Sequence, residues 1–93
     1  MTYLNLPLTD FHDLRLRASR DEQVKIVVMT SETNRFYIAL CDASGSVEVV
    51  LQAPMDKKAQ AFTDIEACVR VAVEISAKGE VFFDRSIRLP TSR

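Results

Sequence analysis

Three segments in the first half of the chain alternate apolar and polar residues with the period of two that is typical of β-strands. They cover Val24 to Thr30, Arg35 to Cys41 and Val47 to Gln52, and each is bounded by polar or turn-forming residues. The link between the second and third segments, Asp42 to Ser46, contains Gly45 and is short enough for a hairpin turn. The pattern therefore predicts three antiparallel strands connected as a meander.

The segment before the first strand has the spacing of an amphipathic helix. Apolar residues recur every three or four positions from Leu8 to Ala18. Thr9 and Asp10 are residue types that cap a helix N-terminus, and the arginines of this segment follow toward its C-terminal end. We predict a helix here, preceded at Met1 to Pro7 by a short arm or edge strand.

Two patterns compete in the segment Phe62 to Gly79. Its apolar residues alternate with other residues as in a strand, but Thr63 to Glu66 matches a helix capping box and Lys78 to Gly79 matches a helix stop. We predict a helix because β-branched residues cost a helix only about a few tenths of a kcal/mol each, and a partial strand is the alternative. On this helix Val73 lies near the polar edge, half exposed or covered by another chain. The predicted buried stripe is Ile65, Cys68, Val69, Ala72 and Ile75.

The last segment, Glu80 to Leu89, alternates again and predicts a fourth strand, with Val81 and Phe83 on one face and Phe82 on the other. Residues 90–93 are expected to be a frayed tail. The fold class is therefore α+β, with an antiparallel four-stranded sheet, two helices and the order α-β-β-β-α-β. A chain of 93 residues is too short for two independent cores, so we predict a single domain.

The composition limits the classes of partner and the compartment. Twelve Lys and Arg against thirteen Asp and Glu give a formal net charge of −1, so no overall field attracts nucleic acid or anionic lipid. We see neither a secretory signal nor an apolar run of membrane-spanning length. Cys41 and Cys68 lie in apolar contexts, and we interpret them as buried, reduced thiols of a cytoplasmic protein.

Residues suited to catalysis or cofactor binding are few. The two glycines, Gly45 and Gly79, cannot form a glycine-rich phosphate loop. His12 is the only histidine, and no local spacing of Cys or His matches a metal site. We therefore expect no catalytic residue, no cofactor and no metal. A small enzyme whose site assembles only in space is the third-ranked alternative.

Both faces of the predicted sheet are apolar, although a sheet with helices on one side only should have a polar opposite face. A patch of this kind needs a cover, which the N-terminal arm, one helix on each face or a second chain would provide. We predict a non-catalytic protein-interaction or regulatory module that forms a homodimer or binds a protein partner through this face. The interface candidates are Val27, Met29, Tyr37, Ala39, Val50 and Phe82.

Local clusters of basic residues make nucleic-acid binding the alternative function. The order of helix, three-stranded meander and helix over residues 8–77 is similar to that of double-stranded RNA-binding domains. Lys57 to Ala61 is similar to the basic start of their second helix, whereas the fourth strand has no counterpart in that family. The candidate nucleic-acid contacts are Arg15, Arg17, Lys57, Lys58, Arg85 and Arg88.

Overall fold

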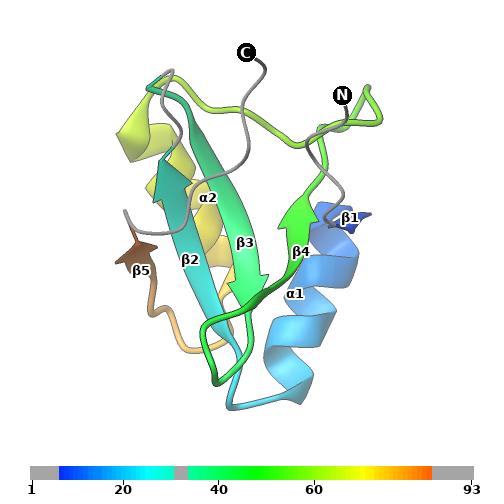
Figure 1. The fold of residues 1–93 in the computed structure, drawn as a ribbon, viewed down its shortest axis with the longest axis vertical. Coiled ribbons are helices and arrows are strands. Elements are labelled where there is room, and N and C mark those ends of the chain that lie inside the picture. The colour runs from blue at the N-terminus through cyan, green and yellow to red at the C-terminus, as the bar shows by residue number, and fades with distance from the viewer. Residues whose placement is uncertain (1–6, 31–33, 85–93) are drawn as a thin grey trace.

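The structure, a computed structural model, describes residues 7–30 and 34–84 (Figure 1). In chain order its elements are β1 (Leu8–Thr9), α1 (Phe11–Arg20), β2 (Lys25–Thr30), β3 (Phe36–Cys41), β4 (Val47–Leu51), α2 (Ile65–Ile75) and β5 (Phe82–Asp84). The predicted α+β class is confirmed, and so is the helix predicted between residues 62 and 79. Residues 1–6 of the predicted arm at residues 1–7, the predicted tail and the end of the last predicted strand lie outside the described residues.

The described strands form one mixed sheet in the spatial order β1-β4-β3-β2-β5. The meander of β2, β3 and β4 is antiparallel, as predicted, but β1 is parallel to β4 and β5 is parallel to β2. The prediction of a four-stranded antiparallel sheet is therefore wrong. The reason is that each helix is a crossover, which carries the chain back to the end of the sheet at which the preceding strand began, so that the next strand runs parallel to it.

Strand β1 occupies residues that we expected at the start of the first helix. Leu8 pairs with Val50 in parallel, and the Val50 amide donates a hydrogen bond to the Pro7 carbonyl oxygen at 2.9 Å. Helix α1 begins only after Asp10, whose side chain accepts a hydrogen bond from the Asp13 amide at 2.8 Å. The predicted cap is thus confirmed, but Leu8 belongs to the sheet.

Helix α2 begins one residue later and ends earlier than the sequence signals suggest. Its N-cap is Asp64, whose carboxylate accepts a hydrogen bond from the Glu66 amide at 3.2 Å, so Thr63 is not the cap. The helix ends at Ile75, and Gly79, with φ of +72°, lies in the turn that follows. A glycine with positive φ marks a turn as readily as a helix end.

The segment after β4 folds back on that strand. The Ala53 amide donates to the Lys58 carbonyl oxygen at 2.9 Å, and the Gln60 amide donates to the Leu51 carbonyl oxygen at 2.8 Å. Ala59 forms an isolated bridge with Gln52. Residues 57–61 therefore do not begin a helix, which their similarity to the second helix of double-stranded RNA-binding domains would imply.

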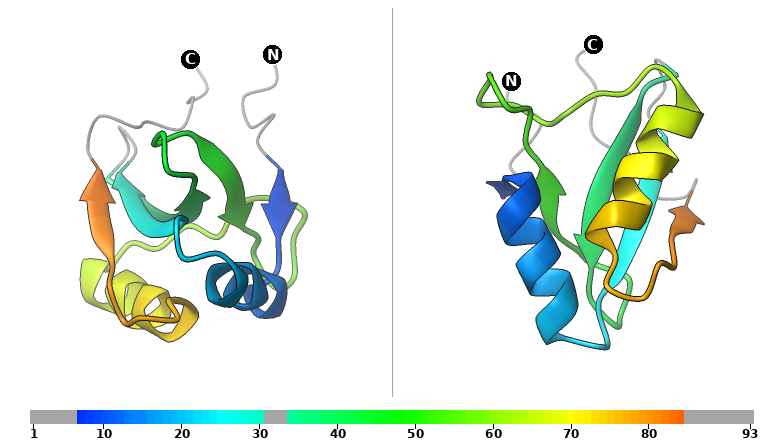
Figure 2. Two further views of the ribbon diagram at one scale, coloured as in Figure 1. Left: turned by 90° about the horizontal axis from the view of Figure 1, so that it is seen from below. Right: turned by 180° about the vertical axis from the view of Figure 1, so that it is seen from behind.

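Both helices lie on the same side of the sheet, which we call the helix face (Figure 2). The buried residues of this side are Leu14, Ile26, Val28, Ile38, Leu40, Val49, Leu51, Cys68, Ala72 and Ile75. The other side, which we call the opposite face, has its own buried cluster: Val27, Met29, Ala39, Cys41, Val50 and Ala59. Of the predicted α2 stripe, Cys68, Ala72 and Ile75 are buried, whereas Ile65 is exposed.

Candidate interaction surface

Four of the six side chains predicted as an interface are already buried within the single chain. Their exposed fractions are 5% for Val27 and 0% for Met29, Ala39 and Val50. Tyr37 is half-buried, and Phe82 on β5 is exposed. A partner therefore reaches only Tyr37 and Phe82 unless the opposite face opens, and the use of this face as an interface stays a prediction.

Both helices cover the same face of the sheet, and neither covers the opposite face. Both α1 and α2 pack on the helix face (Figure 2), so one helix on each face, one of the three covers that the sequence left open, is excluded. Among the described residues, the opposite face gains Ala59 from the segment after β4, and Leu8, Tyr37 and Val47 pack at its margin. These neighbours are small or lie at the edge of the buried cluster.

Strand β5 forms one edge of the described sheet and carries two exposed aromatic side chains. It pairs with β2, so that Phe82 lies opposite Val27 and Phe83 lies opposite Val28. Phe82 is 41% exposed and Phe83 is 59% exposed. The Lys25 Nζ lies 5.0 Å from the centroid of the Phe82 ring, which is within cation-π range. An exposed edge with aromatic side chains is a potential template for another strand.

Helix α2 lies below the half of the sheet that ends in β5 (Figure 2), and it has an exposed apolar flank. Ile65, Val69 and Val73 recur every four residues and therefore lie on one side of the helix. Ile65 and Val73 are each 43% exposed, and Val69 is half-buried. The half exposure that the sequence predicted for Val73 is confirmed.

We define the β5–α2 surface as Ile65, Val69, Val73, Phe82 and Phe83. Of the six large apolar side chains that are exposed in the described part of the chain, four belong to it. The other two, Leu16 and Met55, lie on α1 and in the segment after β4. Exposed apolar side chains thus gather on one edge of the molecule.

Sequence reasoning found this surface only in part. Phe82 was a candidate, but alternation placed Phe83 on the same face as Val81, which does pack against the helix-face core. Phe83 nevertheless remains exposed at the edge of the described sheet. Alternation of apolar and polar residues carries no signal of this edge position.

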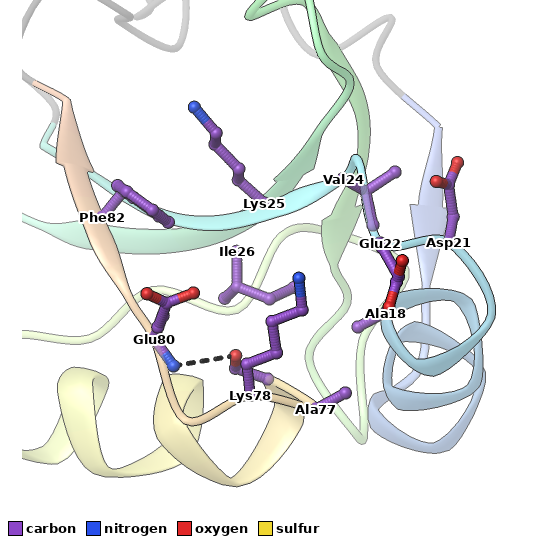
Figure 3. A pocket seen from close by; sticks show the side chains of 11 residues that line it. Ala18, Asp21, Glu22, Val24, Lys25, Ile26, Ala77, Lys78, Glu80 and Phe82 are labelled. Atoms are coloured by element: carbon purple, nitrogen blue, oxygen red, sulfur yellow. Dashed lines mark hydrogen bonds between the residues drawn. The ribbon is translucent and has the colours of Figure 1, made fainter.

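A small hollow borders β5, between the ends of the two helices (Figure 3). Its volume is about 190 Å³, which is below the usual size of a small-molecule site. The loop after α2 is held at this place by a hydrogen bond of 3.1 Å from the Glu80 amide to the Ser76 hydroxyl oxygen. Its charged lining residues have both signs: Asp21, Glu22, Glu80, Lys25 and Lys78. Because the lining carries both charges, the hollow favours neither anions nor cations.

The predicted nucleic-acid contacts do not form one described patch. Arg15 and Arg17 are exposed on α1, but a separation of two residues turns them about 200° apart around a helix. Arg17 Nε donates to Asp13 at 2.8 Å. A Thr9 hydrogen bond and this Arg17 contact lower the pKa of Asp13, so the carboxylate stays charged beside the arginine.

The remaining basic candidates lie elsewhere in the chain. Lys57 and Lys58 are exposed in the segment that follows β4. Arg85 and Arg88 lie outside the described residues. Nucleic-acid binding therefore stays a prediction. The candidate residues within the described ranges do not form a positively charged patch.

The cysteines and the histidine are on separate elements. Cys68 is buried on the helix face, and burial raises the pKa of its thiol to about 12, which disfavours the reactive thiolate. Cys41 is buried on the opposite face, whereas His12 is exposed on α1. The two cysteines lie in separate clusters of the core, one on each face of the sheet.

The described residues include no group of three or more His, Cys, Asp or Glu side chains placed to hold a metal ion. None of the described helices has the length and apolar character needed to span a membrane. No protein-family model, curated protein or solved structure matches the chain.

Proposed function

We propose that this protein is a non-catalytic interaction module that associates with a second copy of itself through the β5–α2 surface. The observation that supports the proposal is the concentration of exposed apolar side chains at one sheet edge. This placement differs from the sequence-based version, in which the opposite face makes the contact. Phe82 belongs to both versions.

The edge position of β5 supports a second copy as the partner. An antiparallel pairing of β5 with β5 of a second chain is self-complementary, because a two-fold axis makes both sides of the contact identical. It would continue the sheet across the dimer and satisfy main-chain groups at the edge. Phe82 and Phe83, on the two faces of the strand, would then each gain a neighbour.

The position of α2 supports the same arrangement. A two-fold axis at β5 would bring the two α2 helices together on the same side of the continuous sheet. Their flanks would meet through Ile65, Val69 and Val73. The exposed neighbours Glu66, Arg70 and Glu74 alternate in sign, so a contact of this kind concentrates no single charge.

The test is the molar mass in solution, measured by light scattering coupled to size exclusion at micromolar concentration. We expect about twice the 10.5 kDa mass of the monomer for the unaltered chain. Phe83→Glu should shift the protein to the monomer, because a buried carboxylate without a partner is costly. Far-UV circular dichroism should show that the variant remains folded.

Two matched variants make the result specific. Leu16→Glu changes an apolar side chain with 40% exposure on α1, and it should leave the mass unchanged. Tyr37→Glu tests the sequence-based version: dissociation by this change, with no effect of Phe83→Glu, would move the interface to the opposite face. A monomeric unaltered chain would contradict self-association through either surface.

A further inference from the structure

A large hollow lies at the other side of the molecule from β5, where the start of α1 meets the end of β4. Its volume is about 700 Å³, which falls within the range of small-molecule sites. The floor and walls are mainly apolar and come from four separate segments. They include Phe11, Leu51, Pro54, Phe62 and Val71.

Main-chain hydrogen bonds hold these walls in place without a ligand. The Gln52 amide donates to the Thr9 carbonyl oxygen at 2.8 Å, which joins the end of β4 to the start of α1. Phe36 and Phe62 exchange two hydrogen bonds, each 2.8 Å long, which fix the segment that leads into α2. The hollow is therefore formed before binding, and a ligand would not have to order it.

The polar groups at the rim present hydrogen-bond acceptors. Gln52 Nε2 donates to the Asp56 carbonyl oxygen at 3.0 Å, and Gln60 Nε2 donates to the Ala61 carbonyl oxygen at 3.3 Å. Each side chain thus uses its amino group within the chain and keeps an amide oxygen as an acceptor. Asp10 accepts from the Asp13 amide through Oδ1, and its second oxygen is a further acceptor.

The charge at the rim is negative. Asp10 and His12 line the hollow, His12 counts as neutral in the formal charge of the chain, and no Lys or Arg of the described ranges lines it. The N-terminus of α1 contributes a partial positive charge of about half a unit, which is smaller than the full charge of the carboxylate. An anion is therefore disfavoured, and a donor with a positive charge matches the site.

We propose that this hollow binds a small molecule with an apolar, ring-sized body and a protonated amine. The ring would lie against Phe11, Phe62 and Val71, and the ammonium group would donate to Asp10 and to the amide oxygens of the two glutamines. The site is separate from the β5–α2 surface, so it does not depend on the function proposed above.

Two probes with the same ring and opposite charge test the inference: tryptamine and indole-3-propionate. In a ¹⁵N–¹H NMR titration, tryptamine should shift the amide signals of residues 10–12, 51–53 and 60–62, with a dissociation constant on the order of 1 mM. Indole-3-propionate should bind about fivefold more weakly, because its carboxylate faces Asp10. Absence of shifts at these residues with tryptamine, or shifts scattered over the whole surface, would overturn the proposal.

Three variants separate the parts of the site. Asp10→Asn keeps a side chain that caps helices well. In this variant tryptamine and indole-3-propionate should bind with about equal affinity. Asp21→Asn removes an exposed carboxylate at the far end of α1 and should leave the preference at about fivefold. Ala53→Phe should fill the hollow and abolish binding of both probes. A preference that survives Asp10→Asn, or binding that survives Ala53→Phe, would contradict the assignment.

Discussion

The helix face and the opposite face of the sheet are both buried, but the central strand β3 gives them side chains of different size. Strand β3 shows the contrast directly, because Ile38 and Leu40 point to the helix face and Ala39 and Cys41 point to the opposite face. The large side chains fill the space of about 10 Å between a sheet and its next layer. The small ones belong to the buried cluster of the opposite face, which also includes Ala59 from the segment after β4.

This difference shows what hydrophobicity alone does not reveal. Apolar residues on both sides of a strand indicate a sheet that is buried on both faces. They do not indicate which face carries the helices, because Val and Ala satisfy an apolar pattern equally well. Side-chain volume distinguishes the two faces, since close packing requires each layer to fill its own space.

The largest effect is expected on the helix face. Leu40→Ala removes a fully buried side chain from beneath the two helices and should lower the free energy of unfolding by about 3–5 kcal/mol. Urea unfolding followed by circular dichroism measures this change. The control Glu48→Ala, at an exposed position on β4, should change stability by less than about 0.5 kcal/mol. A loss below about 1 kcal/mol for Leu40→Ala would mean that the helices do not pack here.

The next prediction concerns the opposite face. Met29→Ala should cost about 2–3 kcal/mol, because Met29 is as fully buried as Leu40 but its unbranched side chain loses more rotamer freedom on burial, which offsets part of the cost of removing it. Met55→Ala is the matched control, since Met55 is 92% exposed and should contribute almost nothing. If Met29→Ala behaved like the control, the opposite face would not be an internal layer of the single chain.

The elements with repeated signals could be predicted from the sequence, and the short edge strands could not. The three meander strands and both helices each contain enough residues for a period to appear. Strand β1 has two residues and β5 has three in the described range, so neither has a period of its own. Their parallel pairing depends on how α1 and α2 cross the sheet, which is a property of tertiary packing.

The candidate surface shows the same limit. The sequence indicated an apolar excess and named Phe82, but it could not place Phe83 at a sheet edge. Ile65 was assigned to the buried stripe of α2, and it is exposed because it lies at the margin of that stripe, in the first turn. Edge and margin positions depend on where neighbouring elements stop, and alternation contains no such information.

The cysteines allow the two faces to be compared by pH. The thiol of Cys68 has a pKa near 12 in the folded chain and an ordinary value of 9.0. Below pH 9 the thiol is protonated in both states, so it adds no pH dependence. Between pH 9 and 12 the unfolded chain loses the proton and the folded chain keeps it, so stability falls by about 1.4 kcal/mol per pH unit.

Cys68→Ala should remove this contribution to the slope. Urea unfolding of the unaltered chain and the variant at pH 8, 9 and 10 would show the difference in stability between them shrinking above pH 9. Cys41→Ala, on the opposite face, should retain the contribution of Cys68 and serves as the control. Parallel stability curves for the unaltered chain and Cys68→Ala would show that the thiol is not shielded from water in the folded state.

The smallest expected effect is at the edge of the opposite face, where Lys25 Nζ lies over the Phe82 ring. A double-mutant cycle with Lys25→Met and Phe82→Leu should give a coupling energy of about 0.5 kcal/mol, as for other exposed cation-π pairs. On the helix face, β5 is preceded by the half-buried Val81, which packs against the core. A coupling of this size would mean that β5 is held firmly on one face and weakly on the other. Phe82 could then turn toward a second chain at little cost, whereas a coupling above about 2 kcal/mol would make it part of the fixed edge.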